Sequence, residues 1–227
     1  LSYKAPLYGR RTAQYLLEPL QFKDARLLFA DFSPEDQVRA YAIYGGTPAY
    51  LQTIDSKKAL DENIVDDILS RGSYLYDEVR FILQQELREP RNYFAILQAI
   101  AAGKTKLNEI KLATGLDGAT AYLDTLQQLH LVERIVPVTT SQPQKSRRGI
   151  YRLKDHYQRF WFRFVHPNRS QLERSGSRLV LENQVLPEID HFASLAFEDI
   201  CQQYFWLEGL SGNLPFQPIN SGRWWNN

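Results

Sequence analysis

Three cations close together are the first feature of this sequence that could do chemistry. Lys145, Arg147 and Arg148 lie in TTSQPQKSRRGIYRL, residues 139–153, a stretch without a single acid. Strand-like runs at 132–138 and 150–153 flank them, which predicts a β-hairpin with a basic tip. Because Lys and Arg side chains neutralise phosphates, this tip suggests contact with a nucleic-acid backbone.

The positive charge of the chain is concentrated around this hairpin. The formal net charge is only +1, yet residues 134–178 hold 11 Lys and Arg against 2 Asp and Glu. Such a block in a neutral chain indicates a polyanionic partner, although a solvated, poorly ordered linker would have the same composition. Four further arginines could add phosphate contacts: Arg134, Arg152, Arg159 and Arg163.

The elements that must position the tip resemble a winged helix-turn-helix. NYFAILQAIAAG predicts a helix that ends at Gly103, and KLNEIKLATG predicts a second that ends at Gly115. GATAYLDTLQQLHLV predicts a third helix with an apolar stripe, and the hairpin follows it. In this motif the third helix usually enters the major groove while the wing lies along the backbone.

The third predicted helix has few groups suited to reading DNA bases. Thr120 and Gln127 could contact base edges. Asp124 would repel phosphate, and the helix contains no Lys or Arg. We therefore expect backbone contacts with little base-specific readout. The alternative is that the winged helix packs against protein and that its cations are simply solvated.

The remainder of the chain also reads as mainly helical. Ser33-Pro34-Glu35-Asp36 predicts a capped helix that continues to Tyr44 and stops at Gly45-Gly46. Thr47-Pro48 starts another helix by the same logic. Further predicted elements are helices at 58–70 and 75–88, an aromatic core helix at 155–165, a polar connector at 167–178, a helix at 188–206 and a strand-like run at 219–225. The predicted fold class is mainly α with a small β component.

Composition excludes several classes of protein. No apolar run approaches the roughly 18 residues of a membrane span, so we expect no membrane partner. Cys201 is the only cysteine and the four histidines are scattered, which excludes an internal disulfide and argues against a Cys/His metal cage. A cytoplasmic location follows as an expectation. The chain contains no Met, which suggests either a fragment of a longer protein or methionines dropped from the numbering.

Seven stretches in order along the chain resemble one family. The stretches are YKAPLYGRRT (3–12), YAIYGGTPAYL (41–51), EPRNYFAILQAIAAG (89–103), LVERIVPVT (131–139), YRLKDHYQRFWFRFVHPN (151–168), FEDICQQY (197–204) and GRWW (222–225). With these stretches the chain looks like the C-terminal part of bacterial and archaeal P-loop ATPases of the AAA/STAND-like group, which carry a winged helix and a restriction-endonuclease-like domain of unknown function.

The resemblance implies roles for several residues. Arg10 would be an arginine-finger or sensor residue facing a γ-phosphate, with Arg11 a weaker candidate. Gly46-Thr47-Pro48 would match a lid element whose backbone approaches the nucleotide, although a helix stop followed by a helix start explains the same residues. Glu198 would match a metal-holding acid of the nuclease-like domain, but a lone carboxylate does not bind Mg²⁺ usefully.

These expectations combine into one hypothesis with a competing alternative. Residues 1–88 would be a helical lid and the end of the ATPase core, 89–156 the winged helix, and 157–227 connector helices with the start of the nuclease-like domain. No Walker A motif occurs, so ATP and Mg²⁺ would belong to the parent protein, and this chain would be non-catalytic without a cofactor. DNA is the expected partner. The alternative is a regulatory or assembly module that binds a partner protein, its own other domains or a second copy.

Overall fold

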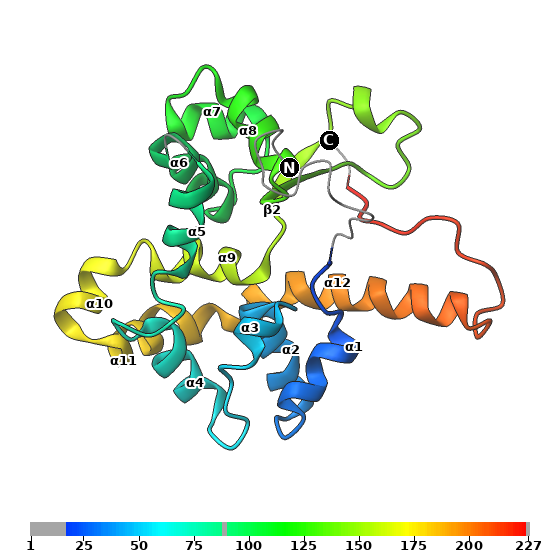
Figure 1. Ribbon diagram of the computed structural model, residues 1–227. Helices are drawn as coiled ribbons and strands as arrows, with labels where there is room; N and C mark the ends of the chain where they lie inside the picture. Colours follow the sequence, from blue (N-terminus) through cyan, green and yellow to red (C-terminus); the bar gives the residue numbers. More distant parts are fainter. Residues whose placement is uncertain (1–16, 88–89, 226–227) are drawn as a thin grey trace, which may run out of the picture.

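The computed structural model describes residues 17–87 and 90–225 (Figure 1). The protein is mainly helical with one two-stranded antiparallel sheet, which confirms the predicted fold class. The N-terminal helices are short. They are α1 (Phe22–Ala25), the 3-10 turn η1 (Arg26–Phe29), α2 (Pro34–Tyr44), α3 (Pro48–Leu51), α4 (Leu60–Asn63) with its π-helical continuation η2 (Ile64–Leu69), and α5 (Glu78–Glu86).

Helix α2 begins and ends where its sequence predicts. Ser33 is the N-cap, and its hydroxyl accepts a hydrogen bond from the Asp36 backbone N–H at 3.2 Å. Pro34 occupies the first helical position, where its missing N–H has no cost. At the other end Gly45 has a φ of 72°, a left-handed conformation that ends the helix and that glycine adopts readily.

Three helices and a hairpin follow in the order expected for a winged helix. They are α6 (Pro90–Ala101), α7 (Leu107–Thr114), α8 (Ala119–Gln128), β1 (Val132–Ile135) and β2 (Ile150–Leu153). The strands pair with Val132 opposite Leu153 and Ile135 opposite Ile150. The connection between the strands contains a 3-10 turn, η3 (Pro143–Lys145), and projects away from the helices (Figure 1).

The C-terminal third packs against both the N-terminal helices and the helices that precede the hairpin. Its elements are α9 (His156–Phe160), η4 (Trp161–Val165), α10 (Arg169–Ser175), α11 (Ser177–Val180), η5 (Leu181–Val185), η6 (Leu186–Glu188) and the long α12 (Ile189–Leu210). The aromatic run of α9 and η4 is core, as its sequence predicts: Tyr157, Phe160 and Trp161 are fully buried. The Trp161 indole N–H donates to the Tyr76 carbonyl oxygen at 2.8 Å. Helix α12 packs against α2 and extends beyond it (Figure 1).

Two predictions of local structure were wrong. The stretch 167–178, predicted as a polar connector, lies largely in α10 and α11, because single apolar residues such as Leu172 and Val180 anchor those turns in the core. The strand-like run 219–225 forms no strand. It returns to the hairpin and makes one backbone hydrogen bond, from the Val138 N–H to the Arg223 carbonyl oxygen at 2.9 Å.

Candidate nucleic-acid interface

The wing tip presents its cations to solvent. Lys145 and Arg147 are exposed and Arg148 is half-buried. Among the residues described here, none of the three lies within 4.0 Å of an Asp or Glu carboxylate. The Arg148 backbone N–H donates to the Ser146 hydroxyl at 3.2 Å, which holds the tip locally. Uncompensated positive charge on a projecting loop is suited to phosphate contact.

The third helix offers little for base readout. On α8, Thr120 is exposed, whereas Gln127 is half-buried and its side-chain amide donates back to the Leu123 carbonyl oxygen at 3.3 Å. Asp124 is exposed on the same helix. With Gln127 engaged locally and no cation on the helix, only Thr120 remains available from the two residues that the sequence suggested.

Arg152, expected to add a phosphate contact, is instead engaged inside the protein. It lies on β2, and its side chain is 24% exposed. Its guanidinium donates to the Asp199 carboxylate at 2.9 and 3.1 Å and to the Glu133 carboxylate on the paired strand. Two carboxylates compensate this charge, so Arg152 holds the hairpin against α12.

The other three arginines near the wing are also used within the chain. Arg134 donates to the carbonyl oxygens of Pro143 and Ser146, so it shapes the wing loop. Arg163 pairs with Glu188 at 2.5 Å. Arg159 lies 3.6 Å from the Asp199 carboxylate and is only 13% exposed. Each of these three guanidinium groups therefore has a partner within the chain, unlike those of the wing tip.

Asp199 is the centre of this network, and sequence reasoning missed it. Its carboxylate, 14% exposed, contacts Arg152, Arg159 and Arg223, and it lies 3.8 Å from His156 Nε2. Burial alone would lower the pKa of Arg152, but the carboxylates of Asp199 and Glu133 raise it above its usual range. The carboxylate is 47 residues away from Arg152 in sequence, and no local pattern pairs such residues.

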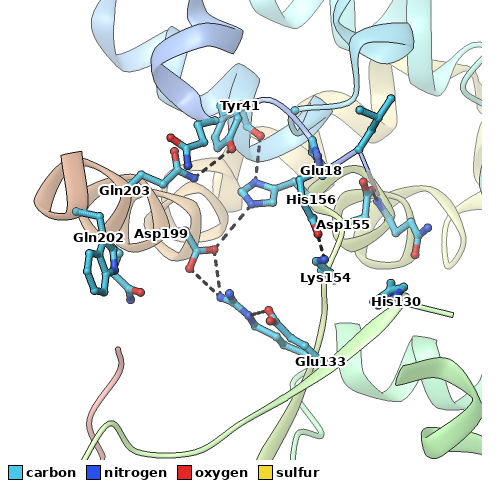
Figure 2. A pocket seen from close by; sticks show the side chains of 17 residues that line it. Glu18, Tyr41, His130, Glu133, Lys154, Asp155, His156, Asp199, Gln202 and Gln203 are labelled. Carbon is cyan, nitrogen blue, oxygen red and sulfur yellow. Dashed lines mark hydrogen bonds and ion pairs between the residues drawn. The ribbon is translucent and has the colours of Figure 1, made fainter. Parts of the chain in front are cut away.

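A cavity of about 600 Å³, lined mainly by polar and charged residue types, lies beside this network, between the hairpin stem, α2, α9 and α12 (Figure 2). His156 lines its wall with a side chain that is 13% exposed, and its Nδ1 lies 3.1 Å from the Tyr41 carbonyl oxygen. Because a carbonyl only accepts, Nδ1 carries the proton of the neutral ring. Burial, followed by the charges of Arg159 and Arg152, lowers the pKa of His156 well below its usual range. The neutral ring therefore leaves Nε2 as an acceptor on the side of Asp199.

The family resemblance implies a nucleotide-binding role for Gly46 and Pro48, and these two residues lie in different environments. Gly46 is buried and lines the cavity, and a side chain there would meet the Leu20 carbonyl oxygen at 2.0 Å. Leu20 N–H also donates to the Gly46 carbonyl oxygen at 2.8 Å, so close packing requires this glycine. Pro48 is the exposed first residue of α3. Arg10 and Arg11 lie outside the described residues.

Glu198 is not part of a metal site in the described structure. It is exposed on α12, and its carboxylate pairs with Arg223 Nε at 3.0 Å. Within residues 17–87 and 90–225, no three His, Cys, Asp or Glu side chains gather as metal ligands would. Glu198 therefore acts with Asp199 in fastening the segment after α12.

Comparison with known proteins identifies relatives whose functions are undefined. Residues 161–227 match the DUF234 family model, described as archaeal and bacterial proteins of unknown function. The whole chain is 33% identical to "Uncharacterized protein MJECL04" of Methanocaldococcus jannaschii over 228 residues. The chain spans about half the length of that curated relative, 50%. No solved structure matches.

Over the described residues, no helix combines the length and the apolar character needed to cross a bilayer. The long helix α12 does not meet that requirement either, since it carries acids such as Glu198, Asp199 and Glu208 among its apolar residues.

Proposed function

We propose that this chain is a DNA-binding part of a longer protein and that its wing tip contacts the phosphate backbone. The observation that carries the proposal is the contrast between the two groups of cations. Lys145, Arg147 and Arg148 have no carboxylate nearby in the described structure, whereas the arginines around them are paired or hydrogen-bonded. A loop that needed cations only for its own folding would use them internally.

The expected contribution of the tip can be bounded. Each phosphate contact adds about 0.9 to the slope of log affinity against log salt, so three contacts give a slope near −2.7. Binding would then weaken by about 40-fold between 50 and 200 mM salt. Three phosphate contacts make a modest contribution to affinity. They position the protein on DNA without specifying a sequence, which is consistent with the absence of Lys and Arg from helix α8.

Fluorescence anisotropy with a labelled duplex across a salt series tests the proposal. The tip variant carries Lys145→Ala, Arg147→Ala and Arg148→Ala. A matched control carries Lys57→Ala, Arg71→Ala and Arg80→Ala, which removes the same charge from three exposed positions away from the wing. We expect the salt slope to fall by two to three in the tip variant and by less than one in the control. An equal fall of the salt slope in both variants would show that the loss reflects net charge and not contacts made by the tip.

The alternative, an assembly module, makes a different demand on the same residues. It requires the tip arginines to pair with acids of residues 179–227 or of a partner. In the described structure four of the six acids in that stretch contact other arginines: Glu188, Asp190, Glu198 and Asp199. The stem of the hairpin therefore serves internal assembly, and this favours DNA as the partner of the tip.

We further propose that the longer protein binds ATP and Mg²⁺ and hydrolyses ATP. The support is the family resemblance of the sequence, together with a curated relative about twice as long as this chain. An ATPase assay on the full-length protein tests it, with Arg10→Ala as the variant. An arginine finger predicts a loss of about 10³-fold in kcat, whereas unchanged turnover would remove Arg10 from the nucleotide site.

A further inference from the structure

A second pair of cations lies beside the hairpin, in the loop that leads into α7. Lys104 and Lys106 are both exposed. Within residues 17–87 and 90–225, the lysines that form ion pairs are Lys23, Lys58 and Lys154, and neither Lys104 nor Lys106 has a carboxylate within 4.0 Å. Sequence reasoning missed this pair, because two lysines separated by a threonine form no conspicuous run of charge.

The backbone places these two lysines next to the wing. Thr105 lies between them, and its carbonyl oxygen accepts a hydrogen bond from the Tyr151 N–H of β2 at 2.8 Å. Arg148 precedes Tyr151 by three residues, so their Cα atoms are at most about 11 Å apart. That distance spans about three phosphates of one DNA strand, which lie about 3.4 Å apart along the helix axis. Helix α7 and the wing loop lie at the same end of the molecule (Figure 1).

The acid near this pair does not cancel its charge. Residues 102–116 contain three lysines and a single acid, Glu109. The Glu109 carboxylate accepts the backbone N–H groups of Thr105 and Lys106 at 3.0 and 3.1 Å. These hydrogen bonds, first of all the one from Lys106, lower the pKa of Glu109. Glu109 therefore serves the backbone at the start of α7, and one negative charge among three lysines leaves the local surface positive.

Helix α8 has the opposite character. Its only charged side chain is Asp124, which is exposed. Asp117, also exposed, lies just before the helix. A helix in the major groove runs between two rows of phosphates, and like charges brought together there oppose binding. The charges of the winged helix therefore favour the hairpin and the start of α7 as the DNA-facing surface, and they disfavour α8.

We propose that duplex DNA binds across the wing tip and the loop before α7, with Lys104 and Lys106 as phosphate contacts, and that α8 stays outside the major groove. This path, which rests on the proposed function of the tip, differs from the usual winged-helix mode, in which the third helix enters the groove. Five phosphate contacts give a salt slope near −4.5, and the two lysines contribute about −1.8 of it.

The anisotropy salt series tests the two lysines. The test variant is Lys104→Ala with Lys106→Ala, and the matched control is Lys57→Ala with Arg71→Ala, which removes the same charge from exposed positions among the N-terminal helices. We expect the slope to fall by about 1.8 in the test variant and by less than about 0.9 in the control. An unchanged slope in the test variant, with a lower slope in the tip variant, would overturn this path and keep the contact by the tip. Unchanged slopes in both would overturn both.

Two substitutions of Asp124 test the position of α8. Asp124→Asn removes the negative charge with little change of shape, and Asp124→Lys replaces it with a positive one. With α8 outside the groove, both variants should have the wild-type salt slope. A slope steeper by about 0.9 for Asp124→Lys, together with tighter binding of Asp124→Asn, would place α8 against phosphates and overturn the proposed path.

Discussion

The hairpin holds arginine in two environments only a few residues apart. At its tip, Arg147 and Arg148 have no carboxylate within 4.0 Å in the described structure. In its stem, Arg152 lies between Glu133 and Asp199, and Arg159 lies close behind it on α9. Both regions are rich in arginine, yet in the described structure only the tip has guanidinium groups that neither a carboxylate nor a backbone carbonyl holds.

The difference shows that a run of cations does not identify a nucleic-acid surface by itself. Acids from distant parts of the sequence form ion pairs with some of the cations, and only the remaining cations are available to a partner. Helix α12 brings Asp199 to the stem, and the segment after it brings Arg223, whose guanidinium lies 3.4 Å from the same carboxylate. We therefore expect changes in the stem to alter stability and changes at the tip to alter binding.

The largest effect is expected for Asp199→Asn. This change removes the carboxylate that Arg152, Arg159 and Arg223 share, and it leaves partly buried guanidinium groups without compensation. We expect the free energy of unfolding to fall by about 3 kcal/mol. Urea denaturation measures it, with Glu198→Gln as the control, since that carboxylate is 45% exposed and should cost less than about 1 kcal/mol. Similar losses in both variants would contradict a central role for Asp199.

A somewhat smaller effect is expected for Arg152→Ala. Asp199 keeps Arg159 and Arg223 as partners in this variant, so we expect a loss of about 2 kcal/mol in the free energy of unfolding. The salt dependence of DNA binding should not change, because the guanidinium faces Asp199 rather than a phosphate. Urea denaturation and the anisotropy salt series measure the two quantities. A lower salt slope in this variant would place the stem in the DNA interface.

His156 predicts a pH dependence of the stem. Its pKa lies well below the usual 6.5 in the folded chain, mainly because of burial, so the unfolded chain takes up the proton first. Stability is therefore highest above pH 6.5 and falls as the pH decreases below it. Between pH 7 and pH 5.5 we expect His156→Asn to lose about 1 kcal/mol less than the wild type. Parallel losses in urea denaturation would show that His156 takes up a proton freely in the folded state.

The smallest effect on stability is expected at the tip. The variant with Lys145→Ala, Arg147→Ala and Arg148→Ala removes no ion pair of the described structure. Its free energy of unfolding should stay within about 0.5 kcal/mol of the wild type, as is usual for exposed positions without partners. The same urea titration measures it. A loss comparable to that of Asp199→Asn would mean that the tip holds the fold.

The sequence predicts those features that depend on neighbouring residues. The limits of α2 follow from Ser33, Pro34 and Gly45, and the basic tip follows from a 15-residue stretch, 139–153. The network in the stem could not be predicted, because Asp199 reaches Arg152, and Arg223 reaches Asp199, only after α12 has folded back under the hairpin. For the same reason Arg152 was assigned to DNA from its charge alone.

Other differences also arise from tertiary contacts. The stretch 167–178 is polar in composition, yet Leu172 is buried and Arg169 pairs with Asp77 at 2.7 Å, and both contacts hold α10. The aromatic end of the chain reads as a strand, but a single backbone hydrogen bond to Val138 does not make a ladder. For Gly46 the sequence predicts the end of a helix, which is a local feature, but not the close contact with Leu20.

The most direct measurement is the salt slope of duplex binding for three proteins in one series: the wild type, the tip triple variant and Arg152→Ala. The separation of tip and stem predicts a slope lower by two to three for the tip variant. It predicts the wild-type slope for Arg152→Ala, despite the lower stability of that variant. An unchanged slope for the tip variant, or an equal fall for both, would contradict it.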